Sequence, residues 1–357
     1  MRKILLLASV LALTSATRAA EKISYPNVIP GFAMEFPRDA GSHPEFRTEW
    51  WYVTGWLMGA DKRERGFQIT FFRARPDNVA ADNPSRFSPR QILFAHVAMS
   101  DPSEGKLLHA QRTARAGLGL AEAKTGATQV WIQDWSLRQE GKGYRAKILA
   151  PQFAFNFLFK TRAAPILNGE RGYSQKSPNP LAASYYYSIP QLQLTGTLTQ
   201  RGKAQAVTGT AWLDHEWSSE YMDPDAAGWD WTGINFDDGA SLMAFRMRDR
   251  SGQTLWAGGS YRNKNGAIKV LRPENISFMP IKHWRSPRTL ASYPVSCRIR
   301  AGDLEIILQP LLDDQELDSG ATIRAVYWEG AVRALIDGKT VGRGYLELTG
   351  YAAPLEF

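Results

Sequence analysis

The chain has 357 residues, which is long enough for two domains with hydrophobic cores of their own. Its 44% hydrophobic and 22% charged residues are typical of a soluble globular protein. The formal net charge of +8 is scattered along the chain, so it predicts some peripheral attraction to envelope membranes and argues against a nucleic-acid partner. The single cysteine, Cys297, excludes an internal disulfide and a thiolate metal cluster, and we expect it to be a buried, inert thiol.

The beginning of the chain has the pattern of an export signal. Arg2 and Lys3 form a basic start, residues 4–13 form a short apolar run, and small residues follow as far as Ala20. An apolar run of this length fits a signal peptide better than a membrane span, and no second run in the sequence is long enough to cross a bilayer. We therefore expect residues 1–20 to be a signal peptide and the mature protein to be periplasmic or secreted.

The first predicted strand covers residues 48–57 and has two apolar faces. Because side chains alternate along a strand, one face carries Trp50, Tyr52, Thr54 and Trp56, and the other carries Glu49, Trp51, Val53 and Gly55. Tryptophans on both faces predict that both faces are covered. Glu49 then needs a partner, and Arg47 is the nearest candidate on its own face. The resulting pair could be a structural ion pair or part of a functional site.

Further short strands are predicted almost to the end of the chain. Phenylalanines alternate with other residues over 153–159, and turn residues at 200–203 and at Asp337-Gly338 predict hairpins. Residues 163–188 are predicted to be a long loop. A helical composition over 110–123 is interrupted by glycines, so no long helix is expected. Regularly spaced hairpins of this kind predict an all-β sandwich or barrel.

Two stretches of the chain repeat one another. The first stretch contains the pentapeptide at 51–55, Gly66 and the Phe-Arg-x-Arg segment at 72–75. The second contains the matching pentapeptide at 229–233, Gly239 and the segment at 245–248. A Gly-x-x-aromatic-Leu-acid pattern ends at Asp214 and again at Glu347. Such a long-period repeat predicts two related β modules. We place them at residues 21–222 and 223–357, with the boundary near the segment Asp223-Pro224-Asp225, which interrupts the strand pattern.

The densest polar and aromatic cluster lies where the two modules are expected to meet. Asp214 and Glu216 should point to one side of their strand, and His215 and Trp217 to the other. Asp230 follows a few residues beyond the boundary, between two tryptophans. An acid, an imidazole and several indole rings around one seam would suit general acid catalysis with stabilisation of a cation. The alternative is that these aromatic side chains only hold two barrels together.

Other catalytic classes find little support in the sequence. No Gly-x-Ser-x-Gly elbow and no phosphate-binding glycine loop is present. The five histidines are single and far apart, and there is no His-Glu-x-x-His motif, so the sequence predicts neither a metal site nor a cofactor.

The motifs together resemble the AttH-like and carotenoid hydratase-like family of secreted proteins. The resemblance rests on residues 43–55, on Trp-Leu-Asp-His-Glu-Trp at 212–217 and on Gly-Trp-Asp-Trp at 228–231, and it spans nearly the whole mature chain. It implies two lipocalin-like antiparallel β-barrels packed together. It also implies cofactor-independent addition of water to an unactivated terminal alkene, and it carries a His-x-Trp pair onto His215 and Trp217. Asp230 lies in the matching region after the seam.

These observations lead to a functional hypothesis with two rivals. We expect an exported protein that binds an apolar, isoprenoid or lipid-like ligand near the seam, with hydratase-like or hydrolase-like chemistry in which Asp230 is the acid and His215 orients water. Trp217 completes the predicted catalytic group, and the predicted ligand-binding residues are Glu49, Trp50, Trp51, Tyr52, Asp214, Glu216, Trp229 and Trp231. The first rival is a non-catalytic lipocalin-like carrier. The second is a glycan-binding or glycan-cleaving module, although Asp214 and Glu216 lie too close in sequence to make it specific.

Overall fold

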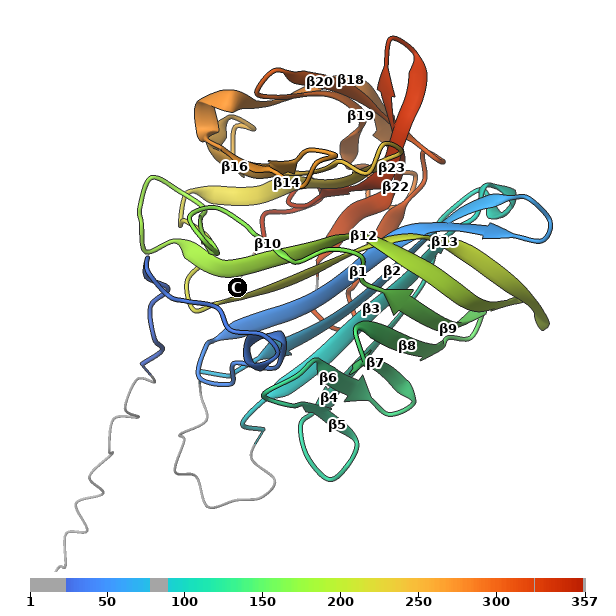
Figure 1. Ribbon diagram of the computed structural model, residues 1–357, viewed down its shortest axis with the longest axis horizontal. Coiled ribbons are helices and arrows are strands. Elements are labelled where there is room, and N and C mark those ends of the chain that lie inside the picture. Colours follow the sequence, from blue (N-terminus) through green and yellow to red (C-terminus); the bar gives the residue numbers. More distant parts are fainter. Residues whose placement is uncertain (1–23, 78–88, 324, 356–357) are drawn as a thin grey trace, which may run out of the picture.

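Two large antiparallel sheets, each curled into a barrel, make up the protein (Figure 1). The structure is a computed structural model that describes residues 24–77, 89–323 and 325–355. The predicted signal peptide lies outside these residues. Within the described residues, no helix has the length and apolar character needed to cross a membrane.

The first sheet has 13 strands and runs in the order β4-β3-β2-β1-β13-β12-β9-β8-β7-β6-β5, with β10 and β11 paired to β12. Its strands are β1 (Thr48–Gly59), β2 (Glu64–Ala74), β3 (Ile92–Ser100), β4 (Leu108–Arg115), β5 (Ala121–Ala123), β6 (Gln129–Ile132), β7 (Trp135–Glu140), β8 (Gly143–Leu149), β9 (Phe153–Lys160), β10 (Ile166–Leu167), β11 (Tyr173–Gln175), β12 (Ala183–Gln200) and β13 (Lys203–Ser218). Two short 3-10 turns, η1 (Arg38–Ala40) and η2 (Pro102–Glu104), belong to this half of the chain.

The second sheet has 10 strands in the order β17-β16-β15-β14-β23-β22-β20-β19-β18, with β21 paired to β22. Its strands are β14 (Ala226–Phe236), β15 (Ser241–Asp249), β16 (Thr254–Arg262), β17 (Ile268–Leu271), β18 (Ile276–Arg285), β19 (Ser292–Ala301), β20 (Leu304–Pro310), β21 (Glu316–Asp318), β22 (Val326–Ile336) and β23 (Lys339–Leu348), and η3 (Pro273–Asn275) precedes β18.

The two sheets repeat one topology. The strand order of the first sheet, read from β4, matches the strand order of the second sheet, read from β17. In this match β1 corresponds to β14, and β13 corresponds to β23. The predicted fold class, all-β with two lipocalin-like barrels from an internal duplication, is confirmed. The chain leaves the first sheet after Ser218 and enters the second at Ala226.

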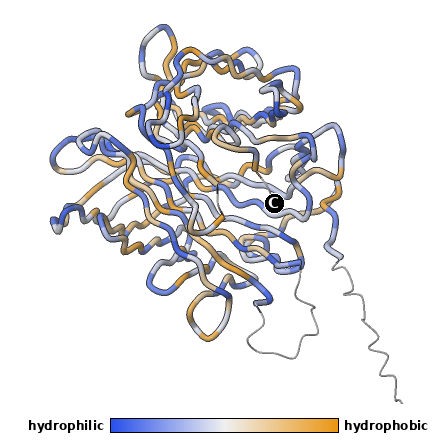
Figure 2. The backbone as a smooth tube through the Cα atoms, turned by 180° about the vertical axis from the view of Figure 1, so that it is seen from behind, coloured by the Kyte–Doolittle hydropathy of each residue, from blue (hydrophilic) through white to orange (hydrophobic). Residues whose placement is uncertain are grey.

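Local sequence signals explain the strands and hairpins. In β9 the phenylalanines from Phe153 to Phe159 are buried at every second position, as the period of two predicts. The turns between β12 and β13 and between β22 and β23 place Arg201-Gly202 and Asp337-Gly338 at positive φ, the conformation of a type I′ hairpin turn. Figure 2 shows the resulting alternation of hydrophobic and hydrophilic segments along the chain.

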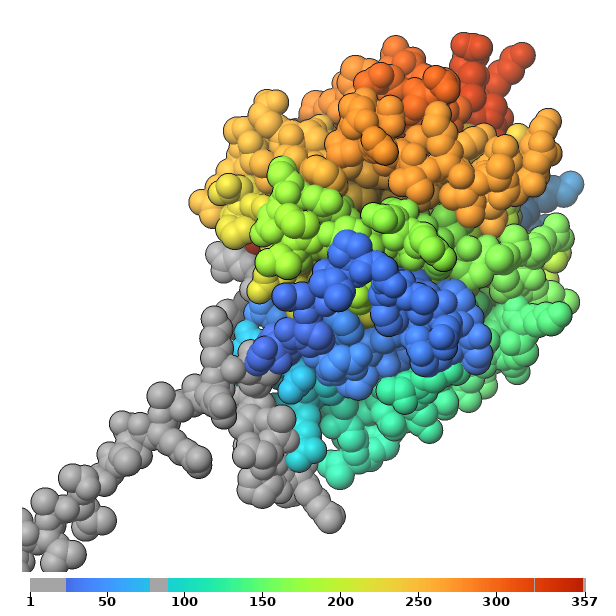
Figure 3. Space-filling model, turned by 60° about the vertical axis from the view of Figure 1, so that its left-hand side comes forward, coloured from blue at the N-terminus to red at the C-terminus, as the bar shows by residue number. Residues whose placement is uncertain are grey.

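The predicted long loop at 163–188 is wrong in its extent. β10 and β11 fall inside it and pair with β12, which already begins at Ala183. The segment before β1 packs on β12 beside β11, because the backbone N–H and carbonyl of Ile29 hydrogen-bond the hydroxyl of Tyr185 and Phe32 packs on the same ring. In Figure 3 this blue N-terminal segment lies directly against the green residues of that region.

Each barrel has its own apolar core, and a third cluster lies between them. The first core is built around the phenylalanines of β2 and β9, and the second contains Cys297, which is buried as expected. The third cluster joins Tyr52, Trp56, Tyr186 and Trp212 of the first barrel to side chains of the second. We call this interface the seam. Its close packing needs the repeat glycine Gly66, since a Cβ there would lie 2.5 Å from the Cβ of Ala331.

Candidate functional site

The seam faces of the strands are those that the sequence predicts. On β1 the even-numbered side chains from Trp50 to Trp56 face the second barrel, and the odd-numbered ones face the core of the first. On β13 Asp214 and Glu216 face the seam, whereas His215 and Trp217 face the first barrel. The seam therefore brings together six of the predicted site residues: Trp50, Tyr52, Asp214, Glu216, Trp229 and Trp231.

Asp214 lies in the middle of the seam and is surrounded by hydrogen-bond donors. The hydroxyl of Tyr186 donates to Oδ2 at 2.7 Å, while the hydroxyl of Ser188 (2.5 Å) and the indole N–H of Trp212 (2.7 Å) donate to Oδ1. Trp231 of the second barrel donates in turn to the Tyr186 hydroxyl at 3.0 Å. Burial raises the pKa of Asp214 to about 7, although these three donors act in the opposite direction. Asp214 can therefore hold a proton near neutral pH.

Three more carboxyl groups share the seam with Asp214. Glu216 is paired with Lys176 at 2.7 Å and accepts a hydrogen bond from Ser184. Glu329 and Glu347 lie opposite each other on β22 and β23. Burial raises the pKa of Glu347 to about 7, and burial together with the neighbouring Glu347 raises that of Glu329 well above its ordinary value. The seam is thus an aromatic layer that contains neutral acids.

The raised pKa values predict how stability depends on pH. Between about pH 4 and pH 7 the unfolded chain releases the protons of Asp214 and Glu347, whereas the folded protein keeps them, so this contribution to the unfolding free energy falls as pH rises. At about 1.4 kcal/mol per pH unit, the loss over this range is roughly 4 kcal/mol for each of the two groups. Urea unfolding across this pH range should show a smaller fall in Asp214→Asn/Glu347→Gln than in the wild type. An equal fall in both proteins would contradict the assignment.

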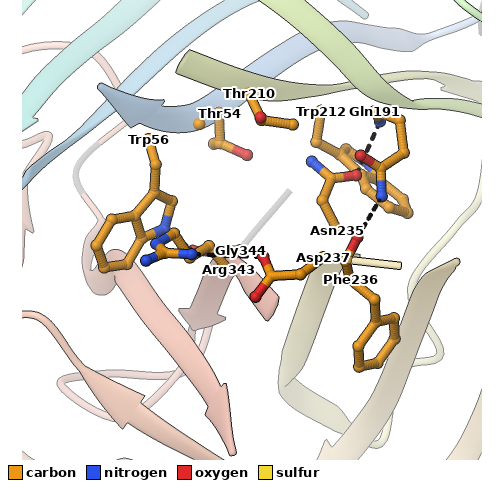
Figure 4. A pocket seen from close by; sticks show the side chains of 11 residues that line it. Thr54, Trp56, Gln191, Thr210, Trp212, Asn235, Phe236, Asp237, Arg343 and Gly344 are labelled. Atoms are coloured by element: carbon orange, nitrogen blue, oxygen red, sulfur yellow. Dashed lines mark hydrogen bonds and ion pairs between the residues drawn. The ribbon is translucent and has the colours of Figure 1, made fainter. Parts of the chain in front are cut away.

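A pocket of about 230 Å³ opens at one end of the seam. Thr54, Thr210 and Trp212 line it from the first barrel, and Asn235, Asp237 and Arg343 from the second (Figure 4). The indole of Trp212 both lines the pocket and donates to Asp214. The pocket is therefore separated from the neutral carboxyl by a single aromatic side chain.

The predicted site residues on the other face of the first barrel form a separate network. The carboxylate of Glu49 accepts hydrogen bonds from His215 (2.9 Å) and His43 (2.8 Å) on Oε1 and from Arg73 (2.8 Å) on Oε2. The predicted partner Arg47 is wrong, because it pairs instead with the exposed Asp77. The Arg73 guanidinium favours the charged form of Glu49, whose pKa is lowered despite burial, while burial lowers the pKa of His215.

Aromatic rings enclose this network. Trp217 stacks on His43 with ring centroids 3.8 Å apart, and Trp51 stacks on His215 at 4.7 Å. His43, Glu49 and His215 offer ligand atoms that all lie within 4.8 Å of one another, a donor set that transition metals accept. Arg73 already occupies the second oxygen of Glu49, however, and a cation placed there would be repelled by the guanidinium. We therefore interpret the network as the anchor of the segment before β1.

Asp230 lies in the interior of the second barrel, away from both groups. Its carboxylate accepts from Arg246 at 2.7 Å and from Arg248 at 2.8 Å, and the hydroxyl of Tyr351 lies 3.0 Å away. The prediction that His215 and Asp230 face one hollow is therefore wrong: each faces the core of its own barrel. A carboxylate held between two guanidinium groups is a structural ion pair rather than a proton donor at the seam.

The physical reason for this error is a one-residue offset between the repeats. Tyr52 lies opposite Asp214 in the first barrel, and Trp231 lies opposite Glu347 in the second. Asp214 and Glu347 end the same pattern and therefore occupy equivalent positions. Tyr52 is thus equivalent in space to Trp231, whereas the motif alignment pairs it with Asp230. A shift of one residue moves a side chain to the other face of a strand.

Comparison with known proteins identifies the family. The AttH-like family profile matches residues 27–351, which is most of the chain. The protein belongs to the AttH-like family. It is similar to a crystal structure from Nitrosomonas europaea provisionally described as an AttH, with 50% identity and a TM-score of 0.85 over 91% of this chain and 99% of the other.

More distant structures share the fold. Kievitone hydratase from Nectria haematococca superposes with a TM-score of 0.68 at 14% identity, over 93% of this chain and 97% of the other. CghA superposes with a TM-score of 0.53 at 14% identity, over 95% and 97%. At this identity the likeness concerns the fold alone. Among curated proteins no match was found.

Proposed function

We propose that this AttH-like protein performs hydratase-like acid catalysis on an apolar ligand at the seam, with Asp214 as the proton donor. The observation that carries the proposal is a fully buried carboxyl whose pKa lies near 7, held by three donors among aromatic rings. A general acid works best when its pKa is close to the working pH. The export predicted from residues 1–20 belongs to the same proposal and would place this chemistry in the cell envelope.

The proposed reaction adds water across a carbon–carbon double bond. The Asp214 hydroxyl transfers its proton to one alkene carbon, and the π electrons form the new C–H bond. The neighbouring carbon becomes a cation, which the ring faces of Trp231 and Tyr52 stabilise; these two rings pack edge to face at 5.2 Å. A water oxygen then bonds to the cation and returns a proton to the Asp214 carboxylate.

Access to the acid requires one side-chain movement. The Trp212 indole lies between the pocket and Asp214, so a ligand in the pocket reaches the carboxyl when this indole rotates. The rotation releases one donor from Asp214, which favours its neutral form further. The ligand then takes the place of the indole beside the acid.

The proposal is tested by following oxygen from water into product. Purified protein is incubated in ¹⁸O-labelled water with small isoprenoids that carry a terminal alkene, and extracts are analysed by mass spectrometry. We expect an alcohol that contains one ¹⁸O atom. Recovery of every bound ligand unchanged, in a one-to-one complex, would instead identify a carrier and contradict the catalytic proposal.

A further inference from the structure

We infer that the pocket at the end of the seam selects a small, neutral ligand that carries a hydroxyl or carbonyl oxygen, and that it does not accept a long polyene hydrocarbon. This inference names the ligand class for the site proposed above and rests on that proposal. Three features of the pocket support it: its size, its charge balance and a hydroxyl group in its lining.

The size of the pocket limits the ligand. Pockets that enclose drug-sized molecules have volumes of roughly 300–1,000 Å³. The volume here is about 230 Å³. When the Trp212 indole rotates, the seam beyond it is still filled by the packed side chains of Trp231 and Tyr345, both of which are buried. A ligand of about ten carbon atoms fits this space, and the chain of a long polyene does not.

The charged groups in and beside the pocket are already balanced. Arg343 lies at the rim and pairs with Glu64 at 2.8 Å and with Asp237 at 3.4 Å. Arg333 pairs with the other oxygen of Glu64 at 2.5 Å. Both guanidinium groups also lie over the ring of Trp56, at 5.2 and 5.8 Å from its centroid. Since neither arginine is left with an unmatched charge, the lining favours a neutral ligand over an anion.

The lining of the pocket carries a hydroxyl group. Thr54 is 1% exposed and lines the pocket, so its hydroxyl is in reach of a ligand there. Gln68, directly opposite Thr54 on β2, has a buried amide oxygen that lacks a partner among the described residues. Buried polar groups are nearly always hydrogen-bonded. A ligand hydroxyl or carbonyl oxygen next to Thr54 would hydrogen-bond its hydroxyl, whereas a hydrocarbon would leave it unpaired.

Trp212 lines the pocket with aromatic surface, whereas the ring of Phe236 lies in the core of the second barrel. Asn235 is occupied by its hydrogen bonds with the backbone N–H of Gln191 and the carbonyl of Ala211. The apolar body of the ligand therefore packs on the Trp212 indole. Because Thr54 lies directly opposite Trp212 across β1 and β13, a ligand oxygen at Thr54 also lies next to the side chain that covers Asp214.

The test compares ligands that share one carbon skeleton. Binding of linalool, of its hydrocarbon counterpart myrcene and of detergent-dispersed lycopene is measured by calorimetry on the intact protein. One net hydrogen bond corresponds to a preference of about two- to tenfold for linalool over myrcene. Lycopene should not bind. Equal affinity for linalool and myrcene, tighter binding of lycopene, or no binding of either ten-carbon compound would overturn the inference.

Isosteric variants assign the preference to one hydroxyl. Thr54→Val should abolish the preference for linalool without weakening myrcene, whereas Thr54→Ser should retain it. Thr208→Val is the matched control, because Thr208 is an exposed residue of β13 outside the pocket lining. An unchanged preference in Thr54→Val would overturn the assignment. Asp214→Asn should keep the ligand preference, so a failure of the catalytic proposal can be told apart from a failure of this one.

Discussion

Replacing Asp214 with asparagine is expected to lower alkene hydration by about 10²- to 10⁴-fold, the usual contribution of a positioned general acid. Asparagine has nearly the same shape and can keep the contacts with Tyr186, Ser188 and Trp212. It cannot donate a carboxylic proton. Ligand binding measured by calorimetry should therefore persist while formation of labelled alcohol is lost. In the wild type, turnover should also fall as pH rises above about 7, where Asp214 loses its proton.

Asp230→Asn is the matched control for this experiment. It makes the same chemical change at a second buried carboxylate, but one that pairs with Arg246 and Arg248 inside the second barrel. We expect it to reduce stability and to leave turnover per folded molecule intact. The opposite result, with activity lost in Asp230→Asn and kept in Asp214→Asn, would return the acid to the position that the motif alignment suggests.

Replacing Glu49 with alanine is expected to destabilise the protein by roughly 3–5 kcal/mol, the cost of breaking one side of a buried ion pair. Arg73 is 2% exposed and would keep its charge without the carboxylate that neutralises it. His43 and His215 would lose the same acceptor. Urea unfolding followed by tryptophan fluorescence measures the change, because Trp51 and Trp217 stack directly on these histidines.

Arg47→Ala provides the comparison for Glu49→Ala. Arg47 is paired with Asp77 at 2.8 Å, but both side chains are partly exposed, and such surface pairs contribute about 0–1 kcal/mol. A small effect of Arg47→Ala beside a large effect of Glu49→Ala would confirm that the network around Glu49 is structural. If Glu49→Ala unfolds at the same urea concentration as the wild type, the anchoring role is wrong.

The architecture could be predicted from the sequence because it depends on local signals and on a repeat. Alternation in β9, the Asp337-Gly338 turn and the echo between Asp214 and Glu347 are all visible in one chain. The faces of β1 and β13 follow from the same alternation. Each of these signals depends either on residues that are neighbours in sequence or on a repeat that is still recognisable when residues are inserted between its parts.

The site could be predicted only in part, since it depends on contacts between distant strands. Lys176 and Tyr186 lie in the stretch predicted as a loop, although Lys176 neutralises Glu216 and Tyr186 donates to Asp214. Glu329 carries no motif at all. Glu347 could have been found, because it ends the same pattern as Asp214. The motif alignment misplaces Asp230 because the repeats differ in register by one residue, although the alternation of side chains along β14 already places Asp230 on the face opposite Trp229 and Trp231.

The central claim is that Asp214 carries a proton at neutral pH inside the seam. Carbon-13 NMR of protein labelled at aspartate carboxyl carbons measures this directly, with the Asp214 signal assigned by its absence in Asp214→Asn. We predict that this carboxyl titrates with a pKa of about 7. Titration at the ordinary aspartate value, near 4, would show an ionised side chain at neutral pH and would contradict its role as the acid.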